Sequence, residues 1–87
     1  MSDTYNLFPT QVVIYSTRAC SDCRLARVFF ESNHIPHLEV EIDGDARATQ
    51  FVSDLNHGFH SVPTIISPDG SILVEPSWDE LKTKFLA

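Results

Sequence analysis

The chain holds two cysteines, and both lie where a strand pattern gives way to a helical one. Cys20 and Cys23 follow the apolar run of residues 12–15 and open a segment without proline or glycine. A sulfur in the first turn of a helix faces unpaired backbone N–H groups and the positive end of the helix dipole, and both favour the thiolate. Two intervening residues let both sulfurs share one turn. The pair therefore indicates redox chemistry, in which one cysteine attacks a disulfide and the other resolves the product.

The composition is that of one small, acidic domain. Its 87 residues are 43% hydrophobic, which is enough for a single core without disulfide or metal support. Twelve acidic and six scattered basic residues give a formal net charge of −6, which argues against nucleic acid and anionic membranes as partners. Residues 1–10 lack lysine, arginine and a long apolar run, so we expect an N-terminal extension to a domain of residues 11–87 rather than a signal peptide. A cytoplasmic monomer is the resulting expectation.

Hydrophobic periodicity and turn residues divide the chain into seven elements. The expected strands span residues 11–15, 38–42, 64–67 and 71–74, and the expected helices span 21–33, 45–56 and 77 to the C-terminus. In the first helix, the spacing of Leu25, Val28 and Phe29 predicts the buried face. The order βαβαββα requires a parallel crossover followed by an antiparallel hairpin. The expected fold is therefore α/β, with a four-stranded mixed sheet flanked by three helices.

Three separated motifs resemble the glutaredoxin branch of the thioredoxin-fold superfamily. The Cys-x-x-Cys pair follows the first strand, residues 61–63 (Ser-Val-Pro) stand where the family has Thr-Val-Pro, and residues 76–81 replace its Gly-Gly-x-Asp-Asp-Leu. Mycoredoxin-like members are the most similar, because they share the runs at 15–17, 62–64, 69–71 and 76–80. The resemblance implies a thioredoxin-like fold and reduction of mixed disulfides between client proteins and a low-molecular-weight thiol, mycothiol or glutathione, with no tightly bound cofactor.

The same resemblance places substrate-binding residues at two further motifs. The family's proline is cis, and a cis bond before Pro63 exposes the backbone of Val62 for pairing with an extended disulfide substrate. Ser77 and Asp79, at the start of the last helix, offer N–H donors and a carboxylate to the charged ends of a small thiol. The same groups also serve as a helix cap, and the sequence does not separate these two roles.

Residues on either side of the cysteines are expected to tune the site. Asp22 stands where glutaredoxins usually have an aromatic residue, and a carboxylate there raises the pKa of the Cys20 thiol against the dipole effect. Arg18 and Arg24 flank the motif and are positioned to offset Asp22, although exposed charges usually contribute little. Thr17, grouped with Arg18 as substrate-binding, replaces the lysine of many glutathione-binding members, which weakens the case for glutathione.

Other functions stay open at this stage. Cys20 and Cys23 followed by His34-x-x-His37 superficially match a zinc site, but about 15 Å of helix separates the two pairs and the histidine spacing is short. A second alternative is a redoxin recycled by a thioredoxin-reductase-like enzyme, although the Trp-Ser-Gly-Phe type segment of such proteins is absent. A non-catalytic domain has no need of two free cysteines, and the family's iron–sulfur carriers usually have one cysteine here.

Overall fold

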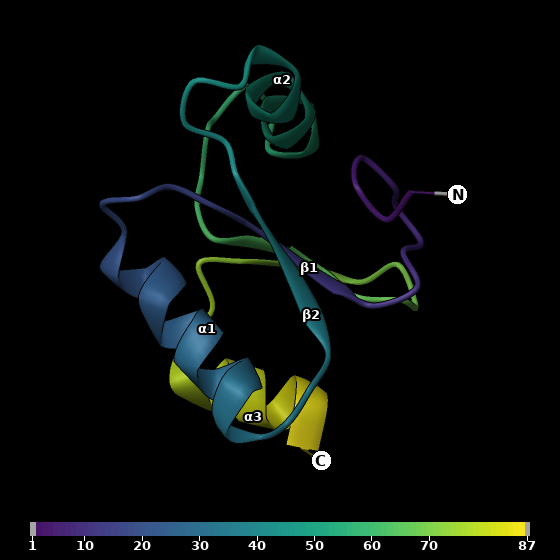
Figure 1. Ribbon diagram of the computed structural model, residues 1–87, viewed down its shortest axis with the longest axis vertical. Coiled ribbons are helices and arrows are strands. Elements are labelled where there is room, and N and C mark those ends of the chain that lie inside the picture. The colour runs from purple at the N-terminus through teal and green to yellow at the C-terminus, as the bar shows by residue number, and fades with distance from the viewer. Residues whose placement is uncertain (1, 87) are drawn as a thin grey trace.

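A four-stranded mixed sheet in the order β2-β1-β3-β4 forms the centre of the protein (Figure 1). The computed structural model describes residues 2–86, so Met1 and Ala87 lie outside the description that follows. β1 (Val12–Ser16) pairs in parallel with β2 (His37–Glu41) and antiparallel with β3 (Thr64–Ile66). A hairpin then joins β3 to β4 (Ile72–Val74).

Helices cover both faces of this sheet. α1 (Ser21–Ser32) and α3 (Trp78–Leu86) pack together on one face, and α2 (Ala46–Leu55) lies on the other (Figure 1). None of the helices within residues 2–86 is long and apolar enough to cross a bilayer. The observed order βαβαββα confirms the predicted α/β architecture.

β1 supplies side chains to both core layers. Since successive residues of a strand point to opposite faces, Val12 and Ile14 pack beneath α1 and α3, whereas Val13 and Tyr15 pack beneath α2. All five residues of the strand are buried. Burial on both faces explains why this segment is an unbroken apolar run instead of an alternating one.

The buried face of α1 differs from the predicted one. The prediction was right for Phe29, which is fully buried, but wrong for Leu25 and Val28, which are 37% and 45% exposed. Ala26 and Phe30 enter the core in their place. Phe29 and Phe30 are consecutive, so their side chains leave the helix in different directions. Both can be buried only when the helix is rotated so that the direction midway between the two side chains points toward the sheet. That rotation lets both rings pack against α3, and it leaves Leu25 and Val28 at the surface.

Residues 2–10 also contact the domain, through Tyr5. The backbone N–H of Tyr5 donates to the Tyr15 hydroxyl at 2.9 Å, and burial raises the pKa of that Tyr15 phenol. The Tyr5 ring packs edge-on against Phe51 of α2, and the guanidinium of Arg47 lies 4.2 Å from the ring centroid. Residues 2–10 are therefore held on the α2 side of the sheet.

The corrected face of α1 gives a direct test. Truncation of the fully buried Phe29 to alanine is expected to lower the free energy of unfolding by about 3–5 kcal/mol, because it leaves a cavity between α1 and α3. Leu25→Ala is the matched control and should cost about 1 kcal/mol or less. Urea denaturation of both variants measures the difference, and an equal loss would restore the face predicted from periodicity.

Candidate active site

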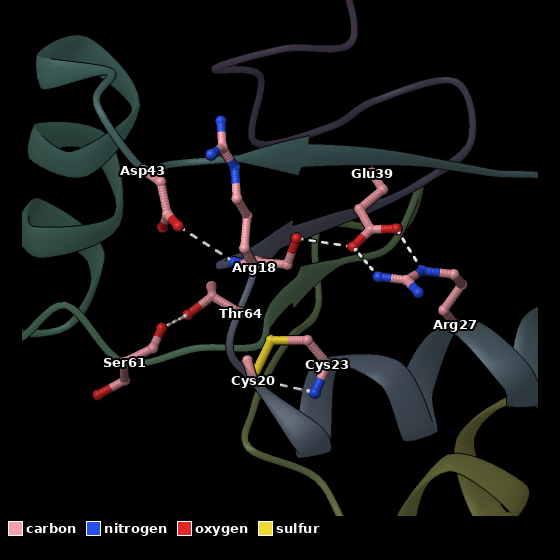
Figure 2. The surroundings of a disulfide bond; sticks show 9 residues. Arg18, Cys20, Cys23, Arg27, Glu39, Asp43, Ser61 and Thr64 are labelled. Atoms are coloured by element: carbon pink, nitrogen blue, oxygen red, sulfur yellow. Dashed lines mark hydrogen bonds and ion pairs between the residues drawn. A yellow bond between two sulfur atoms is a disulfide. The ribbon is translucent and has the colours of Figure 1, made fainter.

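The two cysteines form a disulfide at the turn between β1 and α1, with their Cα atoms 5.2 Å apart (Figure 2). Cys20 is the N-cap of α1, and its Sγ accepts a hydrogen bond from the backbone N–H of Cys23 at 3.1 Å. Cys20 is half-buried, whereas Cys23 is fully buried. Cys20 is therefore the more accessible cysteine of the pair, and its sulfur lies at the N-terminal end of the helix.

The loop before β3 runs beside this turn. Its Val62–Pro63 peptide bond is cis, as the family resemblance implies. β3 pairs with β1 so that Thr64 lies opposite Tyr15, and continuation of this register sets Val62 level with Thr17. The strand pairing therefore brings Thr17, Val62 and Pro63 to the end of the sheet from which the cysteine turn emerges. Figure 2 shows Ser61 and Thr64, at the two ends of this loop, on the same side of the sheet end as the disulfide.

Hydrogen bonds fix this loop from two sides. The buried Thr64 hydroxyl donates to the Ser61 carbonyl at 2.7 Å and accepts from the Asn56 side-chain amide at 3.0 Å. On the other side, the Pro63 carbonyl accepts from the Glu75 N–H at 2.9 Å. Asn56 and Thr64 are positioning residues that the sequence analysis did not identify. The sequence signal that could have indicated Thr64 is a polar threonine at the start of an otherwise apolar strand.

Ser77 and Asp79 belong to the start of α3. The Ser77 hydroxyl accepts from the Glu80 N–H at 3.1 Å, and the Ser77 N–H donates to the Glu80 carboxylate at 3.0 Å. This reciprocal pair is a capping box, so the hydroxyl and the N–H of Ser77 are both occupied. Asp79 lines a cavity of about 520 Å³ between β4 and α3, in which Cys20 takes no part.

The charged residues around the cysteines point in different directions. The Arg18 backbone N–H donates to Asp43 at 3.2 Å, while its guanidinium pairs with Glu41 at 3.3 Å and points away from the disulfide (Figure 2). Asp22 and Arg24 are exposed. The Arg18 charge is thus directed to Glu41 rather than toward Asp22.

A basic cavity of about 400 Å³ opens beside Cys20. It is lined by Arg18, Ala19, Cys20, Ser21, Arg24 and Arg27. Half of the six basic residues of the chain therefore border one cavity. The expectation that they are scattered was wrong, because one turn of helix brings Arg24 and Arg27 to the same side of α1.

Arg27 also anchors a polar network behind this cavity. Its Nε lies 2.6 Å from Glu39 Oε1 and its Nη2 lies 2.8 Å from Oε2, and the Ser16 hydroxyl donates to the same Oε2 at 2.7 Å (Figure 2). The Arg27 hydrogen bonds hold the pKa of the Glu39 carboxyl below its usual value. Because the three residues come from α1, β1 and β2, the network attaches the middle of α1 to the sheet.

The sequence pattern of the glutaredoxin family matches residues 12–72, which include the cysteine turn, the cis proline and most of the sheet. The chain belongs to the glutaredoxin family. Family membership and the Cys20–Cys23 pair make it a glutaredoxin-like thiol–disulfide oxidoreductase.

Individual relatives support this family assignment. The protein Rv3198A of Mycobacterium tuberculosis, named as a glutaredoxin, is 37% identical over 75 residues, which cover 86% of this chain and 89% of the relative. The holo form of glutaredoxin C1 from Populus tremula x tremuloides superposes with a TM-score of 0.70 at 22% identity, covering 92% of this chain and 78% of that one. A buckwheat glutaredoxin–glutathione complex gives 0.70 at 17% identity, with 90% and 70% covered. The structures confirm the thioredoxin-like fold, and the mycobacterial relative agrees with the predicted mycoredoxin-like resemblance.

The geometry of this glutaredoxin places the two halves of the zinc motif apart. Cys20 and Cys23 lie at the first turn of α1, whereas His34 and His37 follow its last turn, twelve helical residues later. Residues 2–86 contain no cluster of three or more histidine, cysteine or acidic side chains placed to hold a metal ion. The zinc alternative therefore gains no geometric support.

The Arg27–Glu39 pair predicts a pH-dependent stability. Glu39→Gln should lower the free energy of unfolding by about 1–2 kcal/mol at pH 7, because the guanidinium loses its charged partner. The folded-state pKa of Glu39 is depressed, so its contribution is complete above the usual value of 4.5 and is lost as the pH falls through the folded-state value.

Thermal or urea unfolding between pH 7 and pH 3 measures this difference. The gap between wild type and Glu39→Gln should close toward the acid end. Glu41→Gln is the control, since the Glu41–Arg18 pair is exposed and should change stability little at any pH. A gap that stays constant with pH would show that the Glu39 charge is not what stabilises the pair.

Proposed function

We propose that this glutaredoxin reduces mixed disulfides between client proteins and a low-molecular-weight thiol, with Cys20 as the nucleophile. The observation that carries the proposal is the asymmetry of the cysteine pair. Cys20 caps α1 and is the more accessible residue, while Cys23 is buried behind it. Nucleophilic attack needs an accessible thiolate, whereas resolution within the chain needs only proximity.

The proposed cycle balances two electrons. The Cys20 thiolate attacks the small-thiol sulfur of the mixed disulfide, and the client leaves as a thiolate that takes up a proton. A second small thiolate then attacks the small-thiol sulfur bound to Cys20, which releases the oxidised small-thiol dimer and restores the Cys20 thiolate. Alternatively, Cys23 attacks the Cys20 sulfur and expels the small thiol. That branch forms the Cys20–Cys23 disulfide seen in the structure, which two further small thiols reduce.

The small thiol is proposed to lie along the cis-proline loop. There the Val62 backbone pairs with it, Pro63 holds the loop at the cysteine turn, and Thr17 lies level with Val62. At the start of α3, the Ser77 groups serve the cap, so we assign recognition of the polar end of the thiol to the first-turn N–H groups and to Asp79. The glutathione in the buckwheat relative supports a small-thiol co-substrate. The motifs shared with mycoredoxin-like members make mycothiol the other candidate thiol.

The cycle suits a reducing compartment, and we place the protein in the cytoplasm as a monomer. A thiol pool is needed there to regenerate Cys20 after each turnover. The proposed partners are disulfide-containing client proteins and the small thiol, and the net charge of −6 disfavours nucleic acid and anionic membranes.

Exchange of the cysteines one at a time tests the roles assigned to them. Cys20→Ser should abolish turnover, because no other described thiol is accessible. Cys23→Ser should retain reduction of small-thiol mixed disulfides, since the small thiol itself resolves the intermediate. Steady-state rates with a glutathionylated or mycothiolated peptide measure both, and full activity of Cys20→Ser would overturn the assignment.

A comparison of reducing systems identifies the thiol. Turnover of one mixed-disulfide peptide is measured with mycothiol, with glutathione, or with a thioredoxin reductase as the electron source. Strong turnover with one small thiol is expected, because the loop and the helix start offer that thiol backbone hydrogen-bond partners. Turnover with the reductase alone would instead establish the redoxin alternative. Absence of turnover in all three would reject the oxidoreductase cycle proposed here.

A further inference from the structure

We propose that the basic cavity beside Cys20 binds an acidic side chain of the client polypeptide, close in sequence to the client's oxidised cysteine. The inference rests on the proposed function, because it concerns the client that leaves when Cys20 attacks the mixed disulfide. It adds a preference for clients with an acidic residue near the oxidised cysteine, which the catalytic cycle itself does not require. The cavity is defined by the lining residues given above, three of which are arginines.

The three arginines differ in how far their charge is already neutralised. Arg27 is held by Glu39 through two hydrogen bonds of 2.6 and 2.8 Å. Arg18 pairs with Glu41 at 3.3 Å, but both side chains are more than half exposed, so that pair is weak. The Arg24 guanidinium makes no hydrogen bond or ion pair with any residue between 2 and 86. Arg24 is therefore the cation left to bind an incoming carboxylate.

The charges facing the cavity leave it positive. Glu39 and Glu41 are each engaged by an arginine, and Asp22, although close in sequence, is exposed and does not line the cavity. Elsewhere the chain is strongly acidic, with a net charge of −6. An acidic peptide is thus repelled by the protein as a whole and attracted at this cavity, which favours binding in one orientation.

The position of the cavity indicates that it binds the client half of the mixed disulfide rather than the small-thiol half. Cys20 belongs to its wall, but no residue of the cis-proline loop or of α3 does. The small thiol is proposed to lie along that loop, so the client half of the disulfide extends over the opposite side of Cys20. The volume of about 400 Å³ accommodates an aspartate or glutamate side chain.

Paired peptides test the proposal. Two peptides carry the same mixed disulfide, one with glutamate and one with glutamine beside the cysteine, and kcat/KM is measured for each. The wild-type protein should prefer the acidic peptide about three- to tenfold at low ionic strength, and added salt should weaken the preference. Arg24→Gln should bring the ratio close to one. Arg47→Gln removes an equal charge at Tyr5, outside the cavity, and should keep the wild-type ratio.

Each alternative result would overturn a specific part of the proposal. Equal rates for the two peptides, or a preference that survives Arg24→Gln, would overturn the cavity as the binding site. If Arg24→Gln and Arg47→Gln weaken the preference for the acidic peptide equally, the preference arises from the net charge of the protein and not from the cavity. In a second pair of substrates the small thiol, and not the peptide, either carries the carboxylate or lacks it. If Arg24→Gln lowers the kcat/KM ratio only for that second pair, the cavity binds the small thiol instead of the client. If neither peptide is reduced, the proposed function fails and the inference with it.

Discussion

The pairing of β1 with β2 on one side and β3 on the other is the interaction on which the site depends. It buries β1 on both faces and fixes the end of the strand from which Cys20 emerges. The antiparallel pair with β3 also brings the cis Val62–Pro63 bond to the cysteine turn, although forty residues separate them in the sequence. Without this pairing, the cysteines and the loop would have no common surface.

A second constraint is electrostatic. The protein is acidic, yet its reactive turn lies against a basic cavity, because the Arg27–Glu39–Ser16 network anchors α1 to β1 and β2. The network uses the charge of Arg27 for structure and leaves Arg24 available for binding. Structural and binding roles are thus divided between two arginines that are three residues apart on one helix. Which arginine stabilises the fold and which is free to bind can be assigned only when the ion-pair partners of each arginine are known.

The sequence predicted most of the fold because its signals are local. Apolar runs, caps and turn residues predicted the seven elements in the right order, and the helix cap expected at Ser77 is present, completed by Glu80. The wrong predictions concern surfaces that meet only in the folded chain. Periodicity alone allowed more than one buried face for α1, and the burial of Phe29 and Phe30 against α3 selected a face that excludes Leu25.

By itself the sequence determined that Cys20 caps a helix directly after a buried strand, since a cap depends on neighbours within one turn. It also determined the motif at Pro63 and the redox character of the cysteine pair. Only the tertiary structure decided that Arg18 turns to Glu41, that Asp79 faces a different cavity, and that the arginines gather beside Cys20. These arrangements depend on the distances between separate elements, which a helical or strand period does not encode.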